Sequence, residues 1–193
     1  LFEGLSIRLE TSMISQNENV SSSNISASET SIETVPDNSL GSLTINSEDL
    51  SKSVDENKQK LENKIQNLNP DEQFQLAFDL LRSQKFDQAK IALNNFIANN
   101  TNNDLSGSAH YWLGEIYLLQ KDFREAALIF AEGYQKYPSS IKASDSLYKL
   151  SIALINIDKI EEACNTLKKF EKENTKNKLV GKVKKKIKEL ECK

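Results

Sequence analysis

Apolar residues in the C-terminal two thirds of the chain recur every three or four positions, in runs that short polar stretches separate. Leu113 and Tyr117 form one run, Ala126 and Phe130 form the next, and residues 120–122 are the polar stretch between them. This spacing puts apolar side chains on one face of a helix, and a short polar break between two runs is typical of a helical hairpin. The pattern predicts an all-α fold.

The hairpin pattern occurs three times at a spacing of 37 residues, without gaps. Six columns of similar residues coincide: Leu76/Leu113/Leu150, Ala77/Gly114/Ser151, Leu80/Tyr117/Leu154, Phe86/Phe123/Ile160, Ala89/Ala126/Ala163 and Leu93/Phe130/Leu167. A fixed period of this length indicates a stack of similar units, each of which covers the apolar face of its neighbour. The copies are predicted at about 70–105, 106–142 and 143–176.

The middle copy has the residue order of a tetratricopeptide repeat: Leu113, Gly114, Tyr117, Ala126, Phe130 and Pro138. A small residue in the first helix allows the two helices to approach closely, and we expect Gly114 to sit where Ala126 crosses it. The period exceeds the usual 34 residues by three, which we attribute to longer turns between copies.

Helix boundaries have their own signals. Asn69, Pro70 and Glu72 form the pattern of a capping box at the start of the first helix. Pro138 is expected to end the second helix of the middle copy, and Ser140 is expected to cap the next helix.

A single apolar stripe marks the last predicted helix, residues 177–192, which is otherwise rich in lysine. Its members are Leu179, Val183, Ile187 and Leu190. Such a stripe suits a helix that caps a stack. The predicted domain, residues 70–193, is therefore a right-handed tetratricopeptide-repeat solenoid of three repeats and a capping helix.

The N-terminal third differs in composition. Residues 3–73 contain no aromatic residue, and Ser, Thr and Asn fill 23 of the 48 positions from 11 to 58. We interpret residues 11–49 as a disordered linker, because such a segment cannot bury enough apolar area to offset its ordering. Residues 1–10 are interpreted as the tail of a truncated coiled-coil region. Residues 50–69 are interpreted as a possible helix with a partial heptad: Leu50, Val54, Leu61, Ile65 and Leu68.

Several strings in residues 70–193 resemble one bacterial family. They are AHYWLGE at 109–115, KDF at 121–123, AA at 126–127, YPSS at 137–140 and EACNTL at 162–167. Together they resemble the C-terminal domain of the Tol-Pal system protein YbgF family, also called the cell division coordinator CpoB family. The first and third copies lack the Tyr-Pro turn of that family and end in residues 99–101 and 173–175.

The resemblance implies a periplasmic protein whose signal peptide has been removed. Residue 1 is Leu rather than Met, so we expect that any targeting peptide was removed or was never in this fragment. The resemblance also implies a homotrimer formed through an N-terminal coiled coil, most of which this sequence lacks. The repeats are expected to bind the inner-membrane protein TolA. With the cell-wall synthesis machinery, such a protein coordinates peptidoglycan synthesis with constriction of the outer membrane during cell division.

The sequence offers little for catalysis or for a cofactor. His110 is the only histidine, and we expect it in an exposed helix position with no catalytic partner. The six glycines are scattered and form no phosphate loop, and two cysteines do not make a zinc site. A net charge of −3 excludes a generic basic nucleic-acid binder. We predict no catalytic, cofactor-binding or metal-binding residue, and hence no enzyme.

The cysteines and the C-terminal lysines each have two interpretations. Cys164 follows a packed alanine and is most simply a small apolar core residue, but it would pair with Cys192 if the capping helix folds back. The lysines at 182, 184, 185, 186 and 188 attract phosphate or anionic lipid, or they form a solvated helix face. We favour the solvated face, because no aromatic residue lies among them.

The first helix of each copy lines the inner surface of such a stack, where a partner segment is expected to bind. The candidate groove residues are Phe74, Phe78, Tyr111, Glu115, Leu118, Tyr148 and Ile152. The same aromatic residues are also suited to fill the hairpin interfaces, and the sequence leaves both interpretations open. Trp112 is either exposed for binding or tucked against the preceding hairpin.

These features predict a periplasmic adaptor whose groove binds TolA. One alternative is an outer-membrane assembly scaffold similar to the repeat lipoproteins of β-barrel insertion. Another is a recruiting appendage of an enzyme such as a cell-wall hydrolase.

Overall fold

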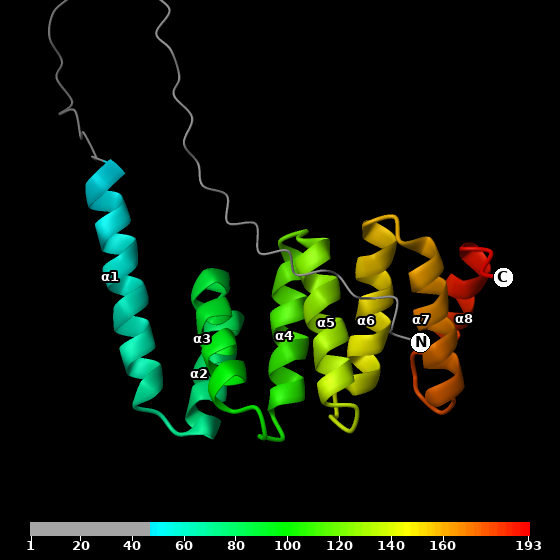
Figure 1. Ribbon diagram of the computed structural model, residues 1–193, viewed down its shortest axis with the longest axis horizontal. Coiled ribbons are helices and arrows are strands. Elements are labelled where there is room, and N and C mark those ends of the chain that lie inside the picture. The colour runs from blue at the N-terminus through cyan, green and yellow to red at the C-terminus, as the bar shows by residue number, and fades with distance from the viewer. Residues whose placement is uncertain (1–46) are drawn as a thin grey trace, which may run out of the picture. The chain divides into compact units, whose positions relative to one another are not determined.

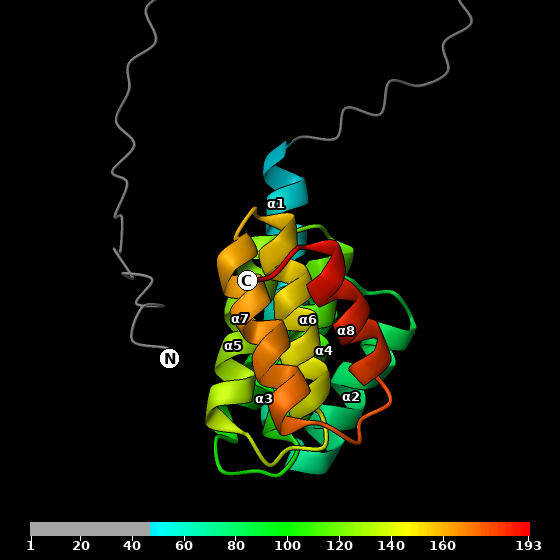
Figure 2. The same cartoon turned by 90° about the vertical axis from the view of Figure 1, so that its right-hand side faces the viewer.

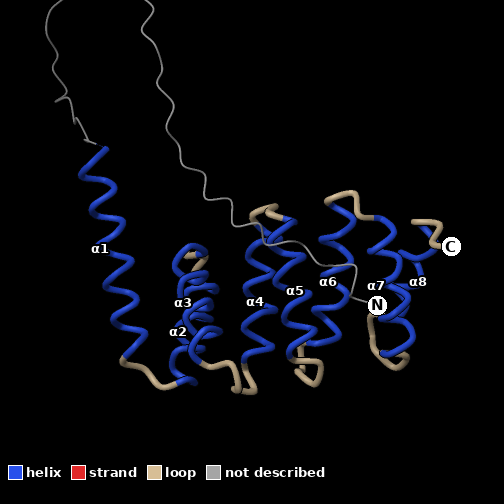
Figure 3. The backbone as a smooth tube through the Cα atoms, viewed as in Figure 1, coloured by secondary structure: helices blue, strands red, loops and turns tan. Residues whose placement is uncertain are grey.

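The computed structural model describes residues 47–193, with side chains from residue 56 onward; the predicted tail 1–10 and most of the predicted linker 11–49 lie outside the described residues. Helices account for all the regular structure in this part of the chain (Figures 1 and 3). They are α1 (Ser47–Gln66), α2 (Pro70–Arg82), α3 (Phe86–Asn99), α4 (Ser106–Leu119), α5 (Phe123–Lys136), α6 (Ala143–Asn156), α7 (Ile160–Glu173) and α8 (Val180–Glu189).

Three helical hairpins, α2–α3, α4–α5 and α6–α7, stack in chain order (Figure 1), and α8 packs against α7 at the end of the stack (Figure 2). The second helices of the hairpins begin at Phe86, Phe123 and Ile160, which are 37 residues apart. Val183 of α8 is fully buried, and Leu179, Ile187 and Leu190 pack around the same core. The predicted all-α solenoid of three hairpins and a capping helix is confirmed.

Two of the three predicted boundary signals are observed. The Asn69 side chain accepts a hydrogen bond from the Glu72 amide, and the Glu72 carboxylate accepts one from the Asn69 amide, each at 3.0 Å. Helix α5 ends at Lys136, directly before Tyr137 and Pro138. The prediction that Ser140 caps the next helix is wrong, because α6 begins only at Ala143. Ser140 instead accepts a hydrogen bond from the Lys142 amide at 3.2 Å within the turn.

The turn inside each hairpin uses the same left-handed residue position. Gln84, Lys121 and Asp158 have φ values of 58°, 62° and 59°. In the first copy the Lys85 amide donates to the Leu80 carbonyl and the Gln84 amide donates to the Leu81 carbonyl, which is a Schellman motif, and the other copies repeat it. A left-handed residue other than glycine costs of order 1 kcal/mol, so the repeated turn is imposed by the packing of the two helices.

The first and third copies replace the Tyr-Pro turn with asparagine. Asn100 and Asn174 follow α3 and α7, and their side-chain amides donate to the carbonyls of Phe96 and Phe170 at 3.0 and 3.2 Å. The same carbonyls also accept the backbone amides of these asparagines at 2.9 Å, so the side chain adds a second hydrogen bond at the end of the helix. These copies therefore end without proline.

The small-residue column lies where the two helices of a hairpin meet. Ala77 and Ser151 are fully buried, and a methyl group added to Gly114 would lie 2.7 Å from the ring of Phe130. The ring of Phe130 thus lies directly against Gly114, and the expected crossing with Ala126 stays a prediction. The middle copy has Phe130 where the other copies have leucine, and the larger ring fits because its neighbour is the smallest residue of the column.

His110 is buried, with a side chain that is 1% exposed, so the prediction of an exposed position is wrong. Its column partners are Gln73 and Leu147, which are also buried. Gly133 of α5 stands where the other two copies have a phenylalanine, and a methyl group added there would lie 2.5 Å from the His110 Cβ. The imidazole therefore fills space that an aromatic ring fills in the other repeats.

The surroundings of the imidazole favour its neutral form. Nδ1 lies 2.8 Å from the Ser106 carbonyl, and Nε2 lies 4.0 Å from the Glu132 carboxylate, which also pairs with Lys136. Burial lowers the pKa of His110 below its usual 6.5, although the Ser106 carbonyl and Glu132 act in the opposite direction.

Helix α1 packs against α3 through its C-terminal end. Ile65 is 1% exposed, and Leu61 packs against the core of the first repeat. The buried Gln73 amide donates to the carbonyls of Ile65 and Leu68 at 3.1 and 2.9 Å, and the Gln73 oxygen accepts from Asn100 at 2.9 Å. Part of the predicted heptad therefore serves intramolecular packing. The coiled-coil role and the trimer stay predictions.

A disulfide joins Cys164 of α7 to Cys192 beyond α8, with Cα atoms 5.5 Å apart. Of the two interpretations of Cys164, the structure supports the pairing, although this residue also lies in the buried face of α7. The bond fixes the end of the capping helix to the last hairpin.

We predict that Cys192→Ser lowers the free energy of unfolding by about 3 kcal/mol, because a crosslink across 28 residues restricts the unfolded chain. Urea denaturation with and without a reducing agent measures this change. The reduced natural chain should match the variant, and the variant should not respond to the reducing agent. Equal stability of the variant and the oxidised chain would contradict the prediction.

We predict that the chain loses stability as the pH falls below 6.5 and that His110→Gln reduces this loss. The pKa of the buried imidazole is lowered, so the unfolded chain takes up a proton that the folded chain resists, by up to about 1.4 kcal/mol for each pH unit. Urea unfolding of both chains between pH 5 and 7.5 measures the two slopes. Identical slopes would show that His110 does not contribute.

Candidate protein-binding surface

The predicted groove residues all lie on the first helices of the three hairpins. Phe74 and Phe78 lie on α2, Tyr111, Glu115 and Leu118 on α4, and Tyr148 and Ile152 on α6. Apart from the buried Tyr111, these side chains are half-buried. The contacts of each side chain show which of them are core residues and which form a common surface.

Phe78, Trp112 and Tyr111 form a continuous row of rings across two repeats. The Phe78 and Trp112 rings lie edge to face with centroids 5.3 Å apart, and the Trp112 and Tyr111 centroids are 5.1 Å apart. Edge-to-face pairs of this kind are favourable beyond the area they bury. Trp112 is therefore tucked against the preceding hairpin through Phe78, which is the second of the two predicted alternatives.

Lys142, in the turn before α6, covers two of these rings. Its Nζ lies 4.8 Å from the centre of the Tyr111 ring and 5.5 Å from that of Trp112. The same ammonium group lies 3.5 Å from the Asp145 carboxylate. A cation over an aromatic face is attracted by the ring electrons, so Lys142 extends the row from the second repeat to the third.

Glu115 is tied to the third repeat by an ion pair. The Lys149 ammonium group lies 2.8 Å from a Glu115 carboxylate oxygen, and the side chains are 31% and 19% exposed. The pair joins α4 and α6, which also contact each other directly. We name Phe78, Tyr111, Trp112, Glu115, Lys142, Asp145 and Lys149 together the first-helix surface.

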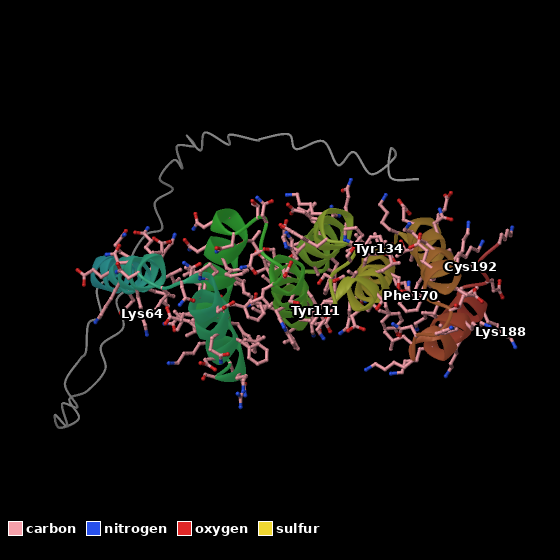
Figure 4. All side chains as sticks on the ribbon, turned by 90° about the horizontal axis from the view of Figure 1, so that it is seen from below. Lys64, Tyr111, Tyr134, Phe170, Lys188 and Cys192 are labelled. Carbon is pink, nitrogen blue, oxygen red and sulfur yellow. A yellow bond between two sulfur atoms is a disulfide. The ribbon has the colours of Figure 1, made fainter. Side chains whose placement is uncertain are left out.

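Tyr111, labelled in Figure 4, is the least accessible member of this surface. Its ring also packs against Phe130 of α5, with centroids 6.0 Å apart. Burial, together with the nearby carboxylates of Glu115 and Asp145, raises the pKa of the Tyr111 hydroxyl. The phenol therefore stays neutral at physiological pH and serves mainly to support Trp112 and Lys142.

Three predicted residues pack into the hairpins instead. Phe74 lies edge to face with Phe96, with centroids 5.6 Å apart, and Tyr148 lies edge to face with Phe170 at 6.3 Å. Leu118 packs against the core of the second and third repeats. Ile152 is half-buried on α6 and belongs to neither core cluster in the described part of the chain.

The lysines of the surface escaped the sequence analysis. Lys149 occupies the column of Trp112, and Lys142 lies in the turn before α6. Their contacts with Tyr111, Trp112 and Glu115 depend on how α6 packs beside α4. The three-residue spacing of Lys142 and Asp145 was the available signal for a local ion pair.

A second concave region lies at the turns between repeats. Residues 101–104 and 136–141 line a cleft of about 620 Å³. The Tyr137 hydroxyl donates to the Thr101 carbonyl at 2.8 Å, and Ile141 is 85% exposed. Sequence reasoning missed this cleft, although the 37-residue period puts both turns at the same end of the hairpins.

The described residues offer no site for metal chemistry, because no group of three or more His, Cys, Asp or Glu side chains among them is placed to hold an ion. His110 contacts the Ser106 carbonyl and lies near Glu132. Neither of these is a nucleophile that a histidine base would activate.

None of the helices within residues 47–193 combines the length and the apolar content that crossing a lipid bilayer requires.

Comparison with known proteins agrees with this geometry. Two family profiles, both described as tetratricopeptide repeat, match residues 74–141 and 145–176, together slightly more than half of the chain. Two proteins of Pseudomonas putida, both named cell division coordinator CpoB, are 39% identical to this chain over 51 residues. That match spans 26% of this chain and 19% of each relative, so the chain matches about a fifth of their length. Its repeats point to a protein-interaction module, and the chain belongs to the tetratricopeptide-repeat family.

Proposed function

We propose that this chain is a non-enzymatic periplasmic adaptor that binds a segment of TolA on its first-helix surface and helps to coordinate cell-wall synthesis with constriction during cell division. The row from Phe78 through Trp112 to Lys142 carries the proposal, because it presents aromatic surface across adjacent repeats. The short similarity to the CpoB proteins and the strings quoted above suggest the process and the partner.

The charges on the surface favour a partner segment that is largely apolar. Lys142 pairs with Asp145 and Lys149 pairs with Glu115, so the surface already neutralises its own charges. A charged partner would have to displace one of these pairs, whereas an apolar side chain only has to cover the rings. Aromatic residues that are partly exposed and already packed together are typical anchors of an interface.

We predict that Phe78→Ala and Trp112→Ala each weaken TolA binding about tenfold, because each truncation removes apolar contact area at the first-helix surface. Isothermal titration calorimetry with the purified periplasmic part of TolA measures the affinity. Tyr111 is a poor choice for this test, because its buried ring also supports the hairpin. Circular dichroism and thermal unfolding show whether each variant stays folded.

Leu128→Ala is the matched control, because Leu128 is an apolar residue, 37% exposed, on the second helix α5. Its affinity for TolA should equal that of the natural chain. An equal loss in all three variants would place binding elsewhere on the molecule. Failure of the natural chain to bind would overturn TolA as the partner.

A further inference from the structure

The outer side of the capping helix is a surface of exposed lysines. The apolar stripe of α8 faces α7 and the core, and Val183 is fully buried. On the opposite side, Lys178, Lys182, Lys185 and Lys188 are exposed, and we name these four the lysine face. Lys182, Lys185 and Lys188 are spaced three residues apart, which aligns them along one side of α8, and Lys178 lies in the turn just before that helix. Gly181 lies between them and has no neighbouring side chain within 4 Å of its Cβ direction.

The charge of this end of the molecule is not balanced locally. Residues 168–193 contain eleven lysines and four glutamates, a net charge of +7, whereas the whole chain carries −3. Glu189 is shared between Lys185 and Lys186 at 3.8 and 3.0 Å. Glu171 lies 3.7 Å from Lys184, and Glu173 lies 2.6 Å from Lys169.

No described residue forms an ion pair with Lys178, Lys182 or Lys188. Like charges that gather without partners raise the potential at the surface, and this potential attracts an extended anion. The lysine face also lies at the end of the row of helices, where the next repeat of a longer solenoid would stand, and Lys188 extends from that end (Figures 2 and 4).

We propose that the lysine face binds the surface of an anionic lipid membrane. Lysine is a hydrated point charge on a flexible stem, which suits a diffuse layer of headgroups better than one shaped anion. The face has no aromatic residue to stack on bases and no arginine for paired contacts with phosphate, so nucleic acid is the less suitable partner.

The membrane surface would contact the lysine face, and the apolar side chains of the capping helix would not insert into it. Leu179, Val183, Ile187 and Leu190 are occupied in the core, so the attraction is electrostatic only. Each lysine close to an anionic membrane strengthens binding about fivefold, and four lysines together give several hundredfold. Such binding depends strongly on salt, because dissolved ions screen the attraction between exposed charges. The screening length is about 10 Å at 0.1 M salt and shortens as the salt concentration rises.

This mode of binding leaves the first-helix surface available. Phe78 and Trp112 belong to the first and second repeats, whereas α8 packs at the far end of the third repeat. The membrane and a protein partner would thus contact different parts of the solenoid. The lysine-face proposal does not depend on the identity of that partner.

Co-sedimentation of the full chain with lipid vesicles tests the proposal. Vesicles of phosphatidylcholine with 30% phosphatidylglycerol should bind the chain in about 50 mM salt, and vesicles of phosphatidylcholine alone should not. Binding should disappear in about 500 mM salt. Changing Lys178, Lys182, Lys185 and Lys188 together to glutamine should lower the binding at least a hundredfold.

The matched control changes Lys58, Lys60, Lys64 and Lys85 to glutamine, because these lysines are exposed and give the same change in net charge. The control should keep its binding within about threefold. An equal loss in both variants, or no binding of the natural chain to anionic vesicles in low salt, would overturn the proposal. Binding to duplex DNA in the absence of vesicle binding would assign the face to nucleic acid instead.

Discussion

The close approach of the two helices in each hairpin is the constraint on which the rest of the molecule depends. It requires a small residue in the first helix, and the second helix must fill the space beside it. In the middle copy a glycine stands on each of the two helices, and a large side chain of the other helix packs against it. Phe130 packs onto Gly114, and His110 packs onto Gly133. In the column of Gly114 the larger ring of Phe130 offsets the missing side chain, and the middle hairpin keeps the 37-residue period of the other two.

That stacking decides which aromatic residues are left for a partner. Phe74 and Tyr148 face the second helices of their own hairpins, whereas Phe78 and Trp112 meet across the boundary between two repeats. All four rings are half-buried, so what sets Phe78 and Trp112 apart is their contact across the boundary and not their exposure. The proposed binding surface follows this boundary, and its lysines come from the third repeat.

Both ends of the solenoid are closed by specific contacts. At one end the Gln73 side-chain amide donates hydrogen bonds to the carbonyls of Ile65 and Leu68 at the end of α1, and the Gln73 oxygen accepts one from Asn100 after α3. At the other end the disulfide of Cys164 and Cys192 holds α8 on α7. Terminal hairpins have a neighbour on one side only, so each requires contacts that an internal repeat obtains from the next copy. The lysine face is the solvent side of such an end.

The sequence by itself determined the helical hairpins, their period, the capping box and the capping helix, because these depend on residue spacings of three, four and 37 that any stack of hairpins must keep. It did not determine that His110 is buried, because the sequence pattern predicted an exposed position for this residue. The burial depends on Gly133 of α5, which lies beside His110 in the fold. Nor did the sequence separate Phe78 from Phe74 or pair Lys149 with Glu115. Those outcomes depend on the angle and rotation with which one helix meets another, which only the tertiary packing sets.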